Sequence, residues 1–425
     1  MKQLLFLAGA VLMLMTSCHH NDDSESEQKI ANRTVLIYIA GENHLSPFLF
    51  HKNGWDGNDG ELYEMLVGSQ QINSDNLILY VDASENTPPY LIRYKKGKAV
   101  DSLSMEESYA SDPTTIYKVL STTIEKYPAK DYGLVLWGHA SGWRIENDTI
   151  QYTSVINARQ KANMRRAYGV DNGSNADNDL GKWINMSTLA KVLQRTGQKL
   201  KFIFADCCQF QSIESAYELR NCCDYIIASP AEIPAEGAPY NTMIPAMFNQ
   251  SETFYKQMVD AYYAQTSYGY REPLSVIKTS EIDNLAIATR NVLQSFVLQN
   301  ITEDNPYLNM DNLIYYQGSS YGTYHYMYDM NDFILRYASV EDYAQWKQVF
   351  DKAVVYRTPT FGLDGEWMTN NQNNINFRSF VLDDSHYGGV SMFVPQYPAG
   401  FYSSYNNNIK KTGWYYAAGL EALGW

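Results

Sequence analysis

The sequence predicts an α/β protein: a three-layer αβα sandwich with a mostly parallel central sheet, followed by a C-terminal extension. Several short segments are continuously apolar, which is typical of parallel strands buried on both faces. Segments with the apolar spacing of a helix alternate with them, and this alternation favours helices on both faces of one sheet. Beyond residue 300 the alternation gives way to a stretch rich in Tyr, Asn and Gly, which marks the extension.

Strands are expected where apolar residues run without interruption. The strongest such runs are residues 34–40, 76–81, 132–137, 200–205 and 224–229. Residues 34–40 read TVLIYIA, and these β-branched and aromatic side chains suit a pleated, buried surface. Shorter runs at 274–278 and 388–395 predict two further strands, the second of them in the extension.

Helices are expected between these strands, where apolar residues recur every three or four positions. The predicted helices are residues 113–127, 185–193, 211–220, 254–265 and 283–299. The first is preceded by Ser111-Asp112 and begins with Pro113, a residue that suits the first helical position. The second is expected to begin with a serine cap.

Four regions follow from these patterns. Residues 1–17 and 18–32 precede the first strand, residues 33–300 carry the β–α alternation, and residues 301–425 complete or decorate the fold. Within the alternating region, residues 144–181 form a long polar segment rich in Asn, Asp and Arg. Segments of this length inside a domain are often functional.

The N-terminus has the pattern of a secretion signal. Residues 4–16 are apolar, too few to span a bilayer, and they end in Met15-Thr16-Ser17-Cys18, which resembles a bacterial lipobox. In this interpretation residues 1–17 are removed and the sulfur of Cys18 is lipidated. The alternative is an ordinary secretory signal with an incidental cysteine.

The segment after Cys18 predicts a disordered tether. Residues 19–27 read HHNDDSESE, and such a polar, acidic composition cannot form a core. The segment also resembles the surface-export signals of Bacteroidetes lipoproteins. We therefore expect a lipid anchor in the bacterial outer membrane, with the protein in the periplasm or on the cell surface. No later run reaches the roughly 18 apolar residues of a spanning helix, so the lipid is the expected membrane contact.

The charge balance argues against a nucleic-acid partner. The chain has 47 acidic and 33 basic residues, giving a formal net charge of −14. Binding to a phosphate backbone requires Lys/Arg patches, and the sequence contains no basic stripe that would override this balance.

Cysteines other than Cys18 occur as two adjacent pairs, Cys207-Cys208 and Cys222-Cys223. A disulfide between neighbouring residues is strained, and the pairs lack the spacing of a zinc site. No metal is therefore assigned to them. Most of these cysteines are expected to be buried apolar residues, and the pattern leaves room for one reactive thiol.

A histidine and a cysteine follow two of the predicted strands. His139 comes after residues 132–137, and Cys208 comes after residues 200–205. Ligands of open α/β sheets bind at the carboxyl ends of the strands, so neighbouring strands would place the two side chains together. A thiolate can attack a carbonyl carbon while imidazole accepts and returns the proton. The N–H groups of Ala140 and Cys208 could stabilise the oxyanion, each by about 3 kcal/mol. A hydrogen-bonded loop histidine and core cysteines would give the same pattern.

Five stretches of the chain resemble the clostripain family of cysteine peptidases, whose fold is caspase-like. They are TVLIYIAGENHL, YGLVLWGHASGW, FADCCQFQSIESAYEL, DYIIASPAEIPAEGAPY and TGWYYAAGLEALGW, spread over residues 34–425. The resemblance implies a peptide or protein substrate, with His139 and Cys208 as the catalytic pair. Residues 214–219 fix the register, which sets Cys207 on the family's alanine.

The resemblance also implies cleavage after Arg or Lys. Asp206 matches the family's aspartate before the nucleophile, and Glu236, next to Gly237, matches a later acidic residue. A carboxylate pair would hold a guanidinium by charge-assisted hydrogen bonds. The chain departs from the family at Ala140, where glycine is usual, and at Ala238, where tryptophan is common.

Two family properties concern the polar segment. Members are often activated by cleavage after the histidine segment, and basic residues are available there: Arg159, Lys161, Arg165 and Arg166. Some members require calcium, and the Asp/Asn-rich residues 171–179 could bind it, although their spacing is not that of an EF-hand and a solvated loop is the alternative. No other cofactor is expected.

Two other functions stay open at this point. One is a caspase-like fold that has lost its activity and serves as a surface binding lipoprotein. The other is a cysteine amidase that acts on non-peptide cationic amides. The presence of both His139 and Cys208 argues against the first, and neither residue decides the second.

Overall fold

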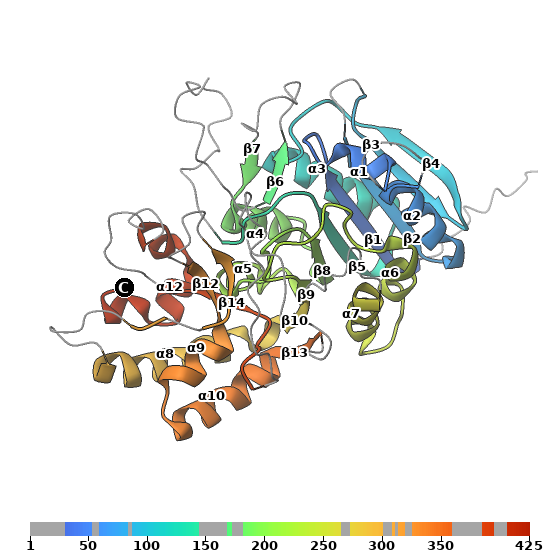
Figure 1. Ribbon diagram of the computed structural model, residues 1–425. Helices are drawn as coiled ribbons and strands as arrows, with labels where there is room; N and C mark the ends of the chain where they lie inside the picture. The colour runs from blue at the N-terminus through green and yellow to red at the C-terminus, as the bar shows by residue number, and fades with distance from the viewer. Residues whose placement is uncertain are drawn as a thin grey trace, which may run out of the picture. The chain divides into compact units, whose positions relative to one another are not determined.

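The first predicted strand lies near the middle of a nine-stranded sheet (Figure 1). The computed structural model describes residues 30–52, 59–83, 87–143, 168–171, 182–264, 273–300, 308–310, 313–318, 325–358, 385–394 and 406–425. The strands of the large sheet are β1 (Ala31–Ala40), β2 (Asn76–Asp82), β3 (Tyr90–Lys95), β4 (Lys98–Ser104), β5 (Ala129–Trp137), β8 (Leu200–Asp206), β9 (Cys223–Ala228), β10 (Ser275–Lys278) and β13 (Val354–Arg357). Their order across the sheet is β13-β10-β9-β8-β5-β1-β2-β3-β4.

The centre of the sheet is parallel and both edges are antiparallel. β2, β1, β5, β8 and β9 are parallel neighbours, which confirms the predicted sheet. β3 and β4 form one antiparallel edge, and β10 and β13 form the other. β3 and β4 are joined at Lys96-Gly97, whose φ values of 51° and 70° suit a tight hairpin. The sequence pattern does not predict this hairpin, because β4 is polar and mostly exposed.

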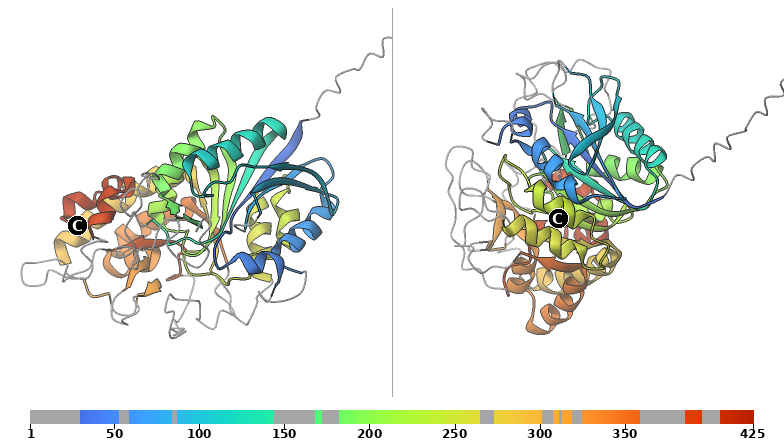
Figure 2. Two further views of the ribbon diagram at one scale, coloured as in Figure 1. Left: turned by 90° about the horizontal axis from the view of Figure 1, so that it is seen from above. Right: turned by 90° about the vertical axis from the view of Figure 1, so that its right-hand side faces the viewer.

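Helices cover both faces of the sheet (Figures 1 and 2). The helices are α1 (Ser46–Phe50), α2 (Glu61–Gly68), α3 (Pro113–Lys126), α4 (Met186–Arg195), α5 (Ile213–Leu219), α6 (Tyr240–Met247), α7 (Phe254–Ala264), α8 (Ile282–Asn300), α9 (Met330–Tyr337), α10 (Val340–Ala353) and α12 (Gly413–Ala417). In Figure 2 the teal α3 and the green α4 lie on one side of the sheet, and α2, α6 and α7 lie on the other.

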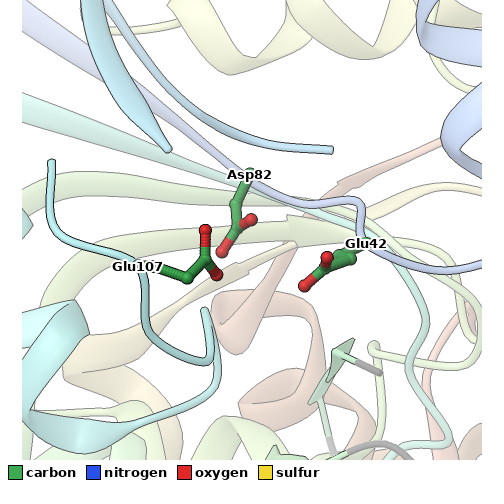
Figure 3. A group of neighbouring side chains, drawn as sticks. All are labelled: Glu42, Asp82 and Glu107. Atoms are coloured by element: carbon green, nitrogen blue, oxygen red, sulfur yellow. The ribbon is translucent and has the colours of Figure 1, made fainter. Parts of the chain in front are cut away.

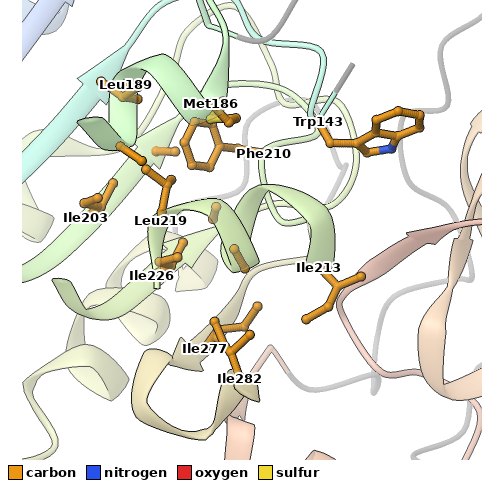
Figure 4. Close-up of a cluster of buried hydrophobic side chains, with 14 of the residues drawn as sticks. Trp143, Met186, Leu189, Ile203, Phe210, Ile213, Leu219, Ile226, Ile277 and Ile282 are labelled. Atoms are coloured by element: carbon orange, nitrogen blue, oxygen red, sulfur yellow. The ribbon is translucent and has the colours of Figure 1, made fainter. Parts of the chain in front are cut away.

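Alternating side chains of the strands enter two separate cores. Along β1, Leu36 and Tyr38 join the core under α3, α4 and α5, whereas Val35 and Ile37 join the core under α2, α6 and α7. This is the period of two that a strand imposes on its side chains. Figure 4 shows part of the first core around α5. Two buried faces explain why the central strands are continuously apolar in sequence.

The helix starts confirm one predicted cap and correct another. Asp112 precedes α3, its side chain accepts a hydrogen bond from the Thr114 N–H at 2.7 Å, and Pro113 is the first helical residue, as predicted. The serine cap predicted for α4 is wrong. α4 begins after Asn185, whose side chain makes no capping hydrogen bond, and a β-region φ/ψ at that residue ends the preceding strand instead.

The extension forms a small sheet of its own and reaches the large one. β11 (Tyr315–Gly318), β12 (His325–Asp329) and β14 (Ser391–Phe393) make a three-stranded antiparallel sheet. β13 also comes from beyond residue 300 and pairs with β10. The predicted strand at 388–395 is therefore confirmed in a shorter form.

Buried Asp329 holds the parts of the extension together. Its Oδ2 accepts hydrogen bonds from the Tyr316 hydroxyl at 2.5 Å and from the N–H groups of Gly388 and Gly389 at 2.8 and 3.0 Å. Its Oδ1 caps α9 by accepting from the Asn331 and Asp332 N–H groups. One carboxylate thus joins β11, β12, α9 and the turn before β14.

The chain from Ala31 to Trp425 is one compact unit, and the unit before it is described only at Ile30. The predicted signal peptide, tether and lipidated Cys18 lie outside the described residues. Across the ranges given above, no helix combines the length and apolarity needed to cross a membrane.

Candidate active site

The predicted histidine and cysteine follow two adjacent strands of the sheet. β5 and β8 are parallel neighbours in which Trp137 is the register partner of Asp206. His139 and Cys208 each come two residues later, so both leave the carboxyl edge of the sheet at the same level. The Gly138 N–H donates to the Asp206 carbonyl at 3.4 Å, which extends the pairing to the start of both loops. The strands are neighbours, as the sequence analysis required.

The two loops are packed against each other. Gly142 has φ +72°, and a Cβ at this position would lie 2.9 Å from the carbonyl oxygen of Gln209. Gln209, directly after Cys208, has φ 55°, a left-handed conformation that costs a non-glycine residue about 1–2 kcal/mol. Its N–H donates to the Ala231 carbonyl at 2.7 Å, which holds the strained turn. The backbone on either side of the thiol is thereby fixed.

The two adjacent cysteines occupy different environments. Cys207 is fully buried, and its Sγ donates to the Leu136 carbonyl at 3.1 Å. Cys208 is half-buried, and its Sγ lies 3.9 Å from the Ile233 carbonyl. Burial, with a smaller contribution from Glu232, raises the pKa of Cys208 to about 12. The thiol of Cys208 is therefore protonated at neutral pH in this geometry.

His139 is held as a neutral imidazole. Burial, assisted by the neighbouring His44, lowers the pKa of His139 to about 3. The rings of His44 and His139 are 4.5 Å apart at an angle of 38°. The Nε2 atom of His139 is buried and accepts or donates no hydrogen bond within the described structure. A neutral imidazole with an unused nitrogen can accept a proton.

Asp206 is a buried carboxylate at the end of β8. Its Oδ2 accepts hydrogen bonds from the Ala238 N–H at 2.9 Å and the Tyr240 hydroxyl at 2.8 Å. Its Oδ1 has no hydrogen-bond partner among the described residues. Burial raises the pKa of Asp206 to about 6, although both hydrogen bonds oppose the shift.

A second buried carboxylate, Glu61, lies beside Asp206. Glu61 is the first residue of α2, and its Oε2 accepts a hydrogen bond from Trp137 Nε1, while its Oε1 is buried without a partner in the described ranges. Burial and then the charge of Asp206 raise the pKa of Glu61 well above its usual range. Gly237, with φ +63°, covers both groups. A Cβ there would lie 2.6 Å from Glu61 Oε1 and 2.9 Å from Asp206 Oδ2.

The sequence analysis missed Glu61. An acidic residue in the first turn of a helix is ordinarily a solvated partner of the helix dipole, so its position carries no sign of burial. Glu236, which the sequence analysis did select, is half-buried next to Gly237. It lies near Lys52, whose pKa is raised by the hydrogen bond and ion pair with Glu64 and also by Glu236. Glu236 is thus at the edge of the acidic group rather than in its buried part.

The other predicted residues are placed as follows. Ala140 forms a bridge to Tyr168 of β6 (Tyr168–Asp171), which pairs with β7 (Lys182–Ile184), and the Gly169 N–H donates to the His139 carbonyl at 2.8 Å. Asp171 is buried at the end of β6. The basic residues of the predicted cleavage loop and the remainder of the predicted calcium segment lie outside the described residues: Arg159, Lys161, Arg165, Arg166 and 172–179.

Comparison with known proteins points to one group. A model of the clostripain family matches residues 37–419. A secreted C11 cysteine protease from Bacteroides thetaiotaomicron, solved with an irreversible peptide inhibitor, superposes with a TM-score of 0.70 at 25% identity, over 92% of this chain and 100% of that one. An inactive zymogen C11 protease from Parabacteroides distasonis gives a TM-score of 0.69 at 27% identity, over 92% and 98% of the two chains. A search of curated proteins gives no match.

The exposure of the cysteines predicts which one reacts with an alkylating agent. Of the four cysteines in the described residues, Cys208 is half-buried and the others are buried. We expect iodoacetamide to label Cys208 first, as read by peptide mass spectrometry. Because a thiol with a pKa of about 12 is about 10⁻⁵ ionised at pH 7, the labelling rate should rise about tenfold per pH unit between pH 7 and 9. Faster labelling of Cys222, or a rate that is flat with pH, would contradict this description of the site.

Proposed function

This chain belongs to the clostripain family of cysteine peptidases, and on that premise we propose that it hydrolyses peptide bonds after arginine or lysine, with Cys208 as nucleophile and His139 as general base. Family membership makes the chain a hydrolase that acts on peptide or protein substrates. The proposal adds the identity of the two catalytic residues and the preference for a cationic P1 side chain.

The protonation states of the pair suggest how the reaction begins. The thiol of Cys208 and the imidazole of His139 are both neutral in the free enzyme. The imidazole takes the thiol proton as the sulfur attacks the scissile carbonyl carbon, and the carbonyl oxygen becomes an oxyanion. The N–H groups of Ala140 and Cys208 are the proposed donors to that oxygen. Collapse of the intermediate breaks the C–N bond, and the imidazolium protonates the leaving amine. Water, deprotonated by the same imidazole, then hydrolyses the thioester.

One observation carries the proposed preference for Arg or Lys. Asp206 and Glu61 are buried side by side under Gly237, and each keeps one oxygen with no hydrogen-bond partner in the described structure. A buried carboxylate oxygen without a partner is costly, and a guanidinium or ammonium group would supply the missing donors and the opposite charge. Because two adjacent carboxyl groups do not readily ionise together, Asp206 provides the charge while Glu61 stays protonated.

The first test separates the two adjacent cysteines. The Cys208→Ala variant should lose at least about 10⁴-fold in kcat/KM on fluorogenic peptides with Arg or Lys at P1, because no nucleophile remains. The Cys207→Ala variant should keep most of its activity, since the Cys207 thiol is buried and bonded to a backbone carbonyl. Peptides with Asp, Ala or Phe at P1 serve as controls, and unfolding curves check that both variants fold. The reverse result for the two cysteines would place the nucleophile one residue earlier.

The second test isolates the charge of Asp206. We compare kcat/KM for matched peptides with Arg or its neutral isostere citrulline at P1, because the ratio cancels the titration of the catalytic pair. Asp206 is protonated below its pKa of about 6, so the ratio should rise with pH, reach half its maximum near pH 6 and level off above pH 7. The plateau should exceed the acid limit by about 10- to 100-fold.

Matched variants decide whether Asp206 causes that pH dependence. Asp206→Asn should give a low ratio that is flat with pH, since Asn still accepts from Ala238 and Tyr240 but carries no charge. Asp224→Asn is the control, because this half-exposed carboxylate pairs with Lys199 at the start of β9. A ratio that titrates identically in Asp206→Asn would exclude Asp206 as the specificity residue.

We further propose that Cys18 is lipidated and anchors the protein in the outer membrane. The segment Met15-Thr16-Ser17-Cys18 after an apolar run supports this, and the related Bacteroides protease is described as secreted. Metabolic labelling with an alkyne fatty acid should mark the wild-type protein and should not mark Cys18→Ala, which would leave the membrane fraction. Release of the wild-type protein into the medium without label would favour an ordinary secretory signal.

A further inference from the structure

Three carboxyl groups meet at the carboxyl ends of β1 and β2, away from the cysteine (Figure 3). Glu42 lies in the loop after β1, Asp82 is the last residue of β2, and Glu107 lies in the loop before α3. One oxygen from each of the three lies within 4.8 Å of the others. Figure 3 shows the three side chains directed toward a common point from three separate segments.

The burial of Asp82 shows that this cluster lacks a partner. Asp82 is 1% exposed, and its Oδ2 accepts a hydrogen bond from the Tyr80 hydroxyl at 3.2 Å. Its Oδ1 is fully buried and makes no hydrogen bond within the described residues. A buried carboxylate oxygen without a partner costs several kcal/mol, so the fold would be expected to provide a positive group or a donor at this place.

The charges around Asp82 have the same sign. Burial is the main reason that the pKa of Asp82 is raised to about 9, and repulsion from the carboxylates of Asp171, Glu42 and Glu107 adds to the shift. Lys182 is paired in register with Asp171 and interacts with that carboxylate. A cation among the three clustered oxygens would turn their repulsion into attraction.

We propose that Glu42, Asp82 and Glu107 bind one hard divalent cation. The three residues offer only carboxylate oxygens, the ligands that calcium and magnesium prefer. Oxygens within 4.8 Å of one another can share an ion at the usual distances of about 2.0–2.6 Å. Glu107 is exposed, which opens the site to solvent and to water ligands. The donor set suits both ions, so the experiment distinguishes them.

The cation would hold the loop that carries His44. The Gly41 N–H donates to the Asp82 carbonyl at 2.7 Å, and Asn43 Nδ2 donates to the carbonyls of Ala40 and Val170 at 3.0 and 2.8 Å. His44, two residues after Glu42, stacks near His139. Cation binding would therefore fix the loop next to the proposed general base, while the site itself does not depend on the proposed reaction.

Binding to the full-length protein tests the proposal directly. After treatment with a chelator, calcium chloride or magnesium chloride is titrated by isothermal calorimetry, and thermal unfolding is followed with and without each salt. We expect one ion per chain and a higher unfolding midpoint with at least one of the two salts. The salt that binds more tightly identifies the ion. No heat and no shift of the midpoint with either salt would overturn the proposal.

Three variants locate the ion. Asp82→Asn and Glu107→Gln should each weaken binding at least about tenfold, because each removes a ligand. Without metal, Asp82→Asn should be at least as stable as the wild type, since it removes a buried charge that its neighbours repel. Glu106→Gln is the matched control: Glu106 is exposed, pairs with Lys118 and should leave binding unchanged. If Asp82→Asn does not fold, the exposed Glu107 still provides the test. Unchanged affinity in Glu107→Gln and Asp82→Asn would place the ion elsewhere and reject this site.

Discussion

The register between β5 and β8 is the constraint on which the active-site geometry depends. Gly133 of β5 is the partner of Phe202 of β8, and a Cβ on Gly133 would lie 2.3 Å from the Phe202 ring. The ring therefore occupies the space that any other residue at 133 would fill, and a slip of the strands would drive it into a side chain. A shift of one residue would also turn every inward side chain outward. The same pairing, four residues further on, joins Trp137 to Asp206 and so sets the level of His139 and Cys208.

Desolvated charge is the second theme of this edge of the sheet. Burial raises the pKa of Asp206 and Glu61 and lowers that of His139, so the groups near the cysteine are held close to neutral until another molecule approaches. Carboxylates that are short of partners bind a cation more strongly than solvated ones do, because less hydration is lost on binding. A rigid sheet with parallel strands supplies such positions naturally, since several strands end at one edge and their last residues share the same buried layer.

Much of the fold could be predicted because its signals are local. The central strands are continuously apolar, and Asp112-Pro113 marks the start of α3 by side-chain chemistry alone. His139 and Cys208 could be selected because each follows such a strand. Glu61 and Asp82 could not, since one resembles a solvated first-turn residue and the other a polar strand end. Their burial arises from Trp137, Gly237 and Tyr80, contacts that no sequence period reveals. The antiparallel edges escaped prediction for a related reason: β4 is polar, and β13 is brought to β10 from a distant part of the chain.

The strand β14 connects the end of the chain to the helix behind the cysteine. The Phe393 N–H donates to the buried Glu214 of α5 at 2.7 Å, its ring lies 4.9 Å from that of Trp143, and the Ser391 N–H donates to the Gln211 carbonyl at 3.0 Å. During synthesis, residues 138–143 and 207–220 leave the ribosome long before these contacts can form. The nascent chain therefore carries a sheet whose cysteine and histidine loops still lack their backing, and the site is completed only when the segment around residue 393 arrives. Ordering of the site is in this way delayed until translation is nearly finished.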